Sequence, residues 1–189
     1  MNFRIATLML FLGGCSMFQP VRDTAVRHLL EPLAPDRALG ATTPAIAVNR
    51  AALPGYLDGR EFVTRRDGVL VASNQDLWAE ALDRGISRVM AENLSRLTGS
   101  MKIQPVENFS TLDYSDLLEL QITHFEPDAA NTMILQGTWK LQPVTGKHGR
   151  DHFFRIAVPM KGGPDVMKDR VTVMNQALVK LAREIVAAE

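Results

Sequence analysis

The chain has 189 residues, of which 46% are hydrophobic and 22% charged, proportions typical of a globular protein. Its 21 basic and 21 acidic residues balance, so the net charge gives no indication of the strongly basic surface with which most domains bind nucleic acid. Cys15 is the only cysteine, so the chain has no internal disulfide and its hydrophobic core must hold the fold.

A bacterial secretion signal that ends in a lipobox is predicted at the N-terminus. A short apolar run over residues 5–12 follows Arg4 and leads into Leu12-Gly13-Gly14-Cys15, an aliphatic residue and two small residues before a cysteine. As a helix this run would span about 12 Å, far less than the roughly 30 Å of a bilayer core. The alternatives are a membrane anchor, which this length disfavours, and a chance cysteine in an ordinary secreted precursor.

The lipobox predicts processing and acylation. We expect residues 1–14 to be removed as a signal peptide after the peptidase recognises Leu12, Gly13 and Gly14. Cys15 would then carry acyl chains, and residues 15–25 would form a lipidated tether to one domain over residues 26–189. Ser16, in place of aspartate, follows the cysteine, and by the usual sorting pattern of lipoproteins this favours the outer membrane.

The first half of the domain is predicted to contain short strands and one long helix. Apolar runs over 25–33 and 45–48 indicate strands, and a loop with an aromatic residue follows at 53–59. Asp67-Gly68 between the runs 61–64 and 69–72 predicts a hairpin. A helix is expected from Asn74 or Asp76, as its capping residue, to Leu97, with Gly99 ending it.

The second half is predicted to be strand-rich. Strands are expected over 102–106, 117–125, 132–143 and 152–158, and alternation places Leu118, Leu120 and Ile122 on one face. A second helix should begin near Pro164, with an apolar stripe from Val166 to Ile185. The order predicts an α+β fold, a single domain in which two long helices pack on one face of a mainly antiparallel sheet.

No catalytic constellation stands out in the sequence, and no cofactor or metal site is predicted. It lacks a nucleophile elbow, a phosphate-binding loop and a zinc-protease motif. His148 and His152 are spaced as metal ligands could be, but glycine beside them favours a solvated loop. His124 and Glu126 should share one side of a strand, where an exposed polar edge is the favoured interpretation.

Five segments together resemble the ABC-type transport auxiliary lipoproteins of the PqiC type. They run from residue 46 to residue 94, after the lipobox, and occur in the same order as in the family. The combination of L-P-x-Y-L-D with W-A-E-x-L is more specific to the family than either motif alone. They are Ile46–Val48, Leu53–Asp58, Phe62–Arg65, Leu77–Leu82 and Ile86–Leu94. Gly59-Arg60-Glu61 departs from the family's usual R-P-Q, Ala81 stands where proline is common, and His28 stands where tyrosine is common.

This resemblance implies a non-catalytic accessory subunit. Its expected partners are a PqiB-like MCE-domain protein, that protein's inner-membrane partner and the outer membrane, which acyl chains on Cys15 would enter. Tyr56, Leu57, Asp58 and Trp78 are candidate contacts in the assembly, including association of the chain into a homo-oligomer. The alternatives are an auxiliary lipoprotein of another ABC exporter, a structural envelope protein, and a periplasmic hydrolase or metal-dependent enzyme.

Overall fold

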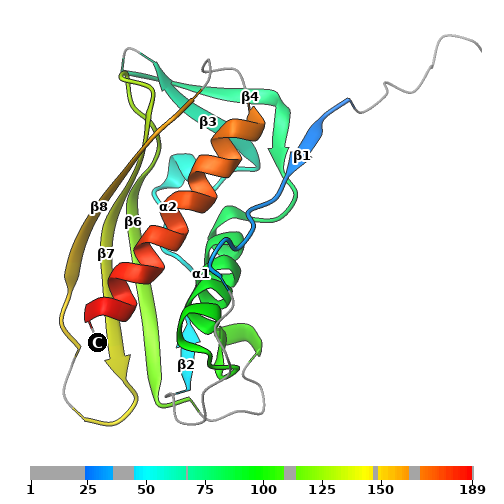
Figure 1. The fold of residues 1–189 in the computed structure, drawn as a ribbon. Coiled ribbons are helices and arrows are strands. Elements are labelled where there is room, and N and C mark those ends of the chain that lie inside the picture. Colours follow the sequence, from blue (N-terminus) through cyan, green and yellow to red (C-terminus); the bar gives the residue numbers. More distant parts are fainter. Residues whose placement is uncertain are drawn as a thin grey trace, which may run out of the picture.

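A computed structural model describes residues 24–35, 45–66, 68–108, 114–146, 149–161 and 167–188. Figure 1 shows the secondary structure of these residues, in which two short 3-10 turns, η1 (Gly55–Leu57) and η2 (Val106–Asn108), accompany the strands and α-helices. The strands and α-helices are, in chain order, β1 (Val26–His28), β2 (Ile46–Val48), β3 (Glu61–Arg66), β4 (Val69–Trp78), α1 (Leu82–Thr98), β5 (Ile103–Pro105), β6 (Asp116–Pro127), β7 (Thr132–Pro143), β8 (His152–Pro159) and α2 (Met167–Ala188).

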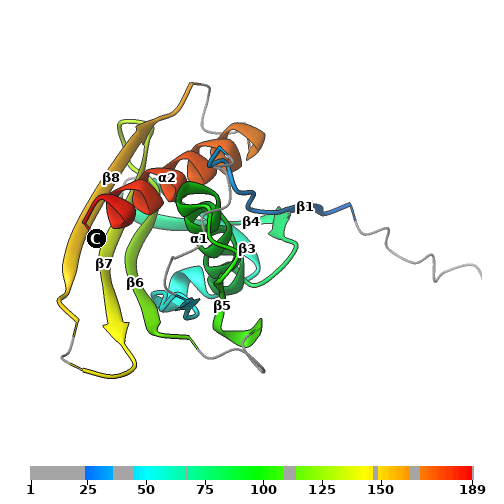
Figure 2. The same cartoon turned by 60° about the horizontal axis from the view of Figure 1, so that its bottom comes forward.

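The larger sheet has five strands in the order β5-β2-β6-β7-β8. β6, β7 and β8 form an antiparallel meander, whereas β2 runs parallel to both β5 and β6. α1 and α2 lie against each other on one face of this sheet (Figures 1 and 2). The α+β class and the placement of the helices are therefore confirmed, and the short parallel strands make the sheet mixed rather than purely antiparallel.

The core fills the space between this sheet and the two helices. Alternate residues of the long strands face the helices, as their polar–apolar alternation predicts. Each fully buried aliphatic side chain contributes about 1.5–3 kcal/mol relative to an exposed one. The core residues that come from β6, β7, α1 and α2 include Leu118, Leu120, Ile122, Leu135, Trp139, Ile86, Met90, Leu94, Met174, Leu178 and Leu181.

A β-bulge in β6 changes which residues face the core. Ile122 pairs with Gly137, but His124 pairs with Gln136, so β6 carries one extra residue between these pairs. A Cβ at Gly137 would lie 2.0 Å from the Gln121 carbonyl oxygen, and only glycine fits there. Beyond the bulge, Phe125 is buried opposite Leu135, and Glu126 pairs with Ile134 on the other face of the sheet.

The predicted start of the first helix is wrong: α1 begins at Leu82, and residues 74–78 belong to β4. The Ser73 hydroxyl accepts a hydrogen bond from the backbone N–H of Asp76 at 3.0 Å and donates one to the Asp76 carboxylate at 3.0 Å. The Asp76 side chain is therefore used within β4 and does not cap a helix. Trp78 stacks on Phe62 with ring centroids 4.3 Å apart. The predicted end is confirmed, since Gly99 follows the helix with φ 73°.

The hairpin of β3 and β4 belongs to a second, smaller sheet in the order β1-β4-β3. Gly68 in its turn has φ 78°, as the Asp-Gly signal predicts. The strand expected over 25–33 is shorter: only Val26–His28 pairs, parallel to the end of β4. His28 Nε2 also donates a hydrogen bond to the Asp76 carboxylate at 2.9 Å.

The segment after β1 is fastened across both helices. The Asn93 side-chain oxygen accepts the backbone N–H groups of Leu33 and Ala34 at 3.0 and 2.9 Å. On α2, the Asn175 oxygen accepts the N–H of Glu31 at 3.1 Å. We call residues 29–35, which these bonds hold, the strap. It connects the predicted tether to the body of the domain.

Candidate interaction site

The loop of residues 53–58 is fixed against β6 at its start. Ala52 forms a β-bridge with Gln121. Its N–H donates to the Leu120 carbonyl at 2.8 Å, and its carbonyl accepts the N–H of Ile122 at 2.9 Å. Pro54, with φ −67° and ψ 146°, then turns the chain into η1. The side chain of Leu57 is buried in the core at 5% exposure, so the loop is held from both sides.

Three side chains meet where this loop crosses the outer face of the larger sheet. The Tyr56 hydroxyl donates to Glu126 Oε2 at 2.9 Å, and Arg65 Nε donates to Glu126 Oε1 at 3.3 Å. The N–H of Phe125 donates to Oε2 as well, at 2.8 Å. Only 3% of the Glu126 side chain is exposed, and these donors satisfy a carboxylate that burial would otherwise disfavour.

The electrostatics of this cluster keep Tyr56 protonated. Burial, and next the hydrogen bond to Glu126, raise the pKa of Tyr56 to about 12. The same carboxylate raises the pKa of the Arg65 guanidinium, which lies 5.7 Å from the centroid of the Tyr56 ring. Tyr56 therefore acts as a hydrogen-bond donor at neutral pH, and the cluster ties loop, hairpin and sheet together.

The four predicted interface residues do not lie on one surface. Leu57 and Trp78 are each 5% exposed and belong to the hydrophobic core. Tyr56 is half-buried with its hydroxyl directed to Glu126, and Asp58 is exposed. Of these four residues, only Asp58 and part of Tyr56 are therefore exposed to a partner. The ring of Trp78 is not, because it stacks on Phe62 in the core.

Two hollows lie beside the segment between β2 and this loop, and both are lined by paired charges. The first, about 280 Å³, is bordered by Arg50, Arg84 and Arg88. Arg88 pairs with Glu80 at 2.6 Å and Arg50 pairs with Glu107. Charges of both signs suit a polar protein surface more than a single anion.

The second hollow, about 240 Å³, lies on the outer face of the larger sheet and is also bordered by Arg50. There Lys140 lies 3.6 Å from Glu119 and 3.9 Å from Asp151. This hollow, like the first, therefore presents paired charges.

The histidines do not form a metal site in the part of the chain that the structure describes. No three His, Cys, Asp or Glu side chains come together there. The His152 ring stacks on Trp139 at 4.1 Å, and His148 lies outside the described residues. His124 and Glu126 share one face as predicted, but Glu126 is buried by the loop, whereas His124 is exposed.

Sequence reasoning missed Glu126 and Arg65 as parts of this site. They lie 70 and 9 positions from Tyr56 along the chain, so no local spacing connects them. The predicted lipidation site and peptidase recognition residues, 12–15, lie outside the described residues. Neither described helix has the length and apolarity that crossing a membrane requires.

Comparison with known families identifies the fold. The model of a family described as ABC-type transport auxiliary lipoprotein component matches residues 28–186. The chain belongs to this family. The match extends from β1 to α2 of the auxiliary lipoprotein and includes the loop, the hairpin and the strap, so the resemblance found in the sequence is confirmed at the level of the family. A search of curated proteins finds no match.

Two solved structures share the architecture of this auxiliary lipoprotein. The crystal structure of an uncharacterized protein aligns at 23% identity with a TM-score of 0.64, covering 80% of this chain and 95% of that one. Protein XCC0632 from Xanthomonas campestris, of the family DUF330, aligns at 15% identity with a TM-score of 0.65 and covers 84% and 92%. At these identities the likeness shows the fold alone.

Proposed function

We propose that this auxiliary lipoprotein is a non-catalytic subunit of an MCE-type intermembrane lipid transport system, anchored to the periplasmic face of the outer membrane by acyl chains on Cys15. It docks onto a PqiB-like MCE-domain protein whose inner-membrane partner drives or gates transport. Association of the chain with further copies of itself is part of the same proposal. The charged hollows and Asp58 offer polar surface for such contacts.

The observation that carries this proposal is the lipobox, placed a short distance before a domain of a transport-auxiliary family. Ten residues separate Cys15 from Val26, a tether of roughly 35 Å when fully extended. The domain would therefore remain close to the leaflet that holds its acyl chains. Two or three acyl chains make such an anchor stable.

The test is affinity purification from mildly cross-linked, detergent-solubilised membranes. We expect the wild type to recover an MCE-domain protein and Cys15→Ala to lose it along with membrane attachment. Fractionation of the two membranes adds a second readout, because Ser16→Asp should move the protein from the outer to the inner membrane. Recovery of another ABC exporter would overturn the MCE assignment, and an unchanged membrane fraction for Cys15→Ala would overturn the anchor.

A further inference from the structure

The turn-proximal part of β4 carries aliphatic side chains that the body of the domain does not cover. Val69, Leu70 and Val71 are 62%, 39% and 47% exposed. Because successive strand residues point to opposite faces, three exposed aliphatic residues in a row mean that both faces of the hairpin are open. Exposed apolar groups gathered in this way mark surfaces that contact a protein or a membrane.

The two faces of the hairpin are not equivalent. Leu70 pairs with Arg65, whose guanidinium reaches Glu126 on the larger sheet, so this face is turned toward the body. Val69 and Val71 point to the opposite face. There Val71 pairs with Thr64, whose hydroxyl donates to the Val71 carbonyl at 3.4 Å, and Val69 pairs with Arg66. The side chains of Val69 and Val71 lie next to each other on this face as a short apolar strip.

A bend in β4 sets the hairpin off from the rest of its sheet. Glu61 pairs with Leu77 and Val63 with Ala72, so residues 73–76 form an excursion opposite one residue of β3. The hydrogen bonds of Ser73 to Asp76 close this bend. β1 pairs only with residues 76–78, and Figure 1 shows β4 turning sharply between its two paired parts.

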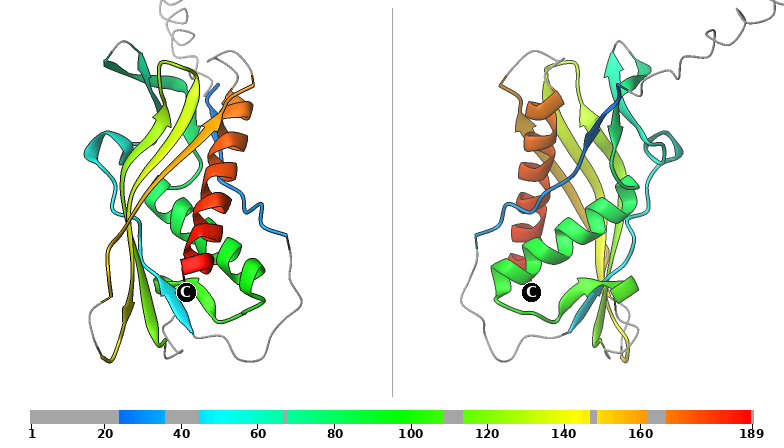
Figure 3. Two further views of the ribbon diagram at one scale, coloured as in Figure 1. Left: turned by 60° about the vertical axis from the view of Figure 1, so that its left-hand side comes forward. Right: turned by 90° about the vertical axis from the view of Figure 1, so that its right-hand side faces the viewer.

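The tether leads to the same end of the molecule. β1, the first described strand, joins the sheet that bears the hairpin, and both views of Figure 3 place the start of β1 and the hairpin turn at one end. Ten residues separate Cys15 from Val26, and a flexible linker of that length would have an end-to-end distance of about 17 Å. Val26, at 55% exposure, adds a further exposed apolar side chain there.

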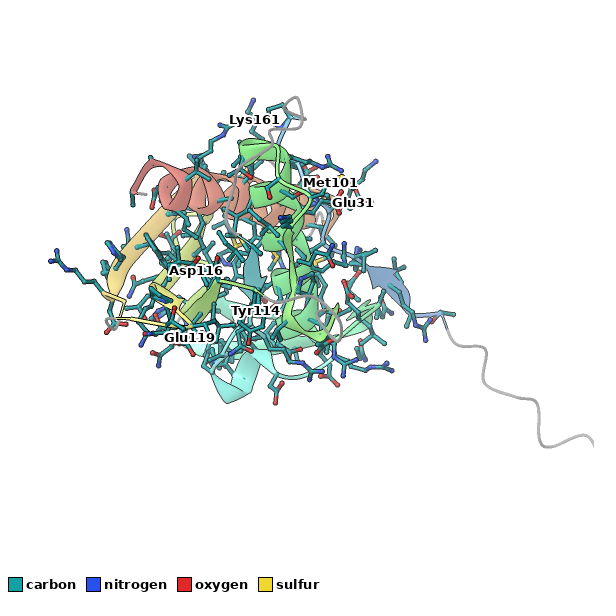
Figure 4. The ribbon with its side chains drawn as sticks, turned by 90° about the horizontal axis from the view of Figure 1, so that it is seen from below. Glu31, Met101, Tyr114, Asp116, Glu119 and Lys161 are labelled. Carbon is teal, nitrogen blue, oxygen red and sulfur yellow. The ribbon has the colours of Figure 1, made fainter. Side chains whose placement is uncertain are left out.

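The other end of the molecule is different in character. Figure 4 is a view of that end, where Tyr114 lies just before β6 and Asp116 and Glu119 lie among its first residues. Met101 and Val144 are also exposed there, at 70% and 59%, but they follow α1 and β7 respectively, and neither belongs to a run of exposed aliphatic residues. The end that carries the hairpin is therefore the one suited to a lipid surface.

We propose that the hairpin of residues 63–72 is a second membrane contact, with Val69 and Val71 resting among the acyl chains of the leaflet that holds Cys15. The contact fixes the orientation of the domain on the membrane and directs the charged hollows away from it. This inference rests on the proposed anchoring through Cys15. Because two or three acyl chains already make the anchor stable, the apolar strip contributes the orientation of the domain rather than the attachment itself.

The experiment uses the full lipidated protein in vesicles of phosphatidylethanolamine and phosphatidylglycerol. Acylation consumes the only native thiol, so Val69→Cys introduces a single site for an environment-sensitive NBD fluorophore. Val144→Cys is the matched control, a valine of similar exposure, 59%, at the other end. We expect a blue-shifted emission and quenching by nitroxide lipids at position 69 and neither at position 144.

Each result bears on the inference. Val71→Asp should abolish the quenching at position 69, whereas Phe153→Asp, on the exposed face of β8, should leave it unchanged. Equal quenching at 69 and 144 would overturn the hairpin contact while vesicle flotation still supports the anchor. A blue shift without nitroxide quenching would mean that protein covers the strip and would overturn it too. A Cys15 without acyl mass would remove the anchor and the inference together.

Discussion

Among single residues, Tyr56 has a raised pKa, which makes the stability of the fold depend on pH. Its pKa is about 12 in the folded chain against an ordinary value of 10.0. A raised folded-state pKa means that the folded state holds the proton more tightly. The stabilisation is therefore complete below pH 10 and is lost as the pH rises through 12. We expect urea midpoints to fall across this window, and to fall less in Tyr56→Phe.

Absorbance titration checks the same prediction directly, since the chain has two tyrosines. In a Tyr114→Phe variant, the remaining phenol should ionise near pH 12. At neutral pH, Tyr56→Phe should cost about 1.5–3 kcal/mol, the net value of a hydrogen bond to a charged group. Ionisation near pH 10 in the folded Tyr114→Phe protein would contradict the bond to Glu126.

Asp58 is the best residue with which to test the predicted interface without disturbing the fold. Its side chain is exposed at the end of η1, and surface substitutions of this kind usually change stability by less than about 0.5 kcal/mol. Asp58→Arg should therefore weaken recovery of the transport partner while the urea midpoint stays unchanged. Glu184→Arg, at an exposed acidic position of α2, is the control. Equal recovery from both variants would exclude the loop as a contact.

Trp78 is unsuitable for that purpose because it is buried. Removing a buried tryptophan costs about 3–5 kcal/mol, so loss of binding in Trp78→Ala would report unfolding. The resemblance correctly drew attention to this aromatic residue, but the family motif alone does not distinguish a core role from an interface role. The stacking on Phe62, sixteen positions earlier, is the fact that decides it.

At the scale of elements, the strap depends on one side chain of α1. Asn93 is fully buried, and its oxygen holds two backbone N–H groups. Asn93→Ala leaves both without an acceptor, at about 1–3 kcal/mol for each buried group. We expect a loss of roughly 2–4 kcal/mol in unfolding free energy and faster hydrogen exchange at Leu33 and Ala34.

Asn175→Ala is the matched comparison, because it frees only the N–H of Glu31. It should destabilise less and should leave exchange at Leu33 and Ala34 slow. Arg88 and Arg96 also hold the strap, donating to the carbonyls of Leu30 and Ala34 at 2.8 and 3.4 Å. Unchanged exchange in Asn93→Ala would mean that these two arginines are sufficient.

Elements whose pattern is local in the chain could be predicted from the sequence, whereas elements defined by contacts between distant residues could not. β7, β8 and the part of β6 before its bulge alternate between polar and apolar residues, so the local pattern predicts these three strands closely. The start of α1 was misplaced because Leu77 and Trp78 continue the helical spacing of residues 82–97, and only the contact of Trp78 with Phe62 reveals a strand. β1 and β2 have three residues each, too few for periodicity to indicate their parallel partners.

The candidate site was predictable in part for the same reason. The motif of residues 53–58 identified the loop, but nothing near Tyr56 indicates a bond to Glu126 across the sheet. The strap did leave a signal: Asn93 interrupts the apolar stripe of α1 between Met90 and Leu94. A polar residue on the core face of a helix indicates a buried hydrogen bond, although its partner is found only in the structure.

For the molecule as a whole, the two sheets share one hydrophobic core, and this predicts a single cooperative transition. Phe62 and Trp78 of the smaller sheet belong to the same buried cluster as Trp139 of the larger one. The chain has two tryptophans, one in each sheet, so each reports on a different part of the fold. Small domains with one core normally unfold in an all-or-none manner.

Single-tryptophan variants make this testable. In Trp78→Phe the remaining fluorescence reports on the larger sheet, and in Trp139→Phe it reports on the smaller one. Either substitution lowers stability, so the comparison is made within each variant, between tryptophan fluorescence and far-UV circular dichroism. We expect coincident urea transitions in both. A fluorescence transition at lower urea in Trp139→Phe alone would mean that the smaller sheet, with its hairpin, unfolds before the larger one.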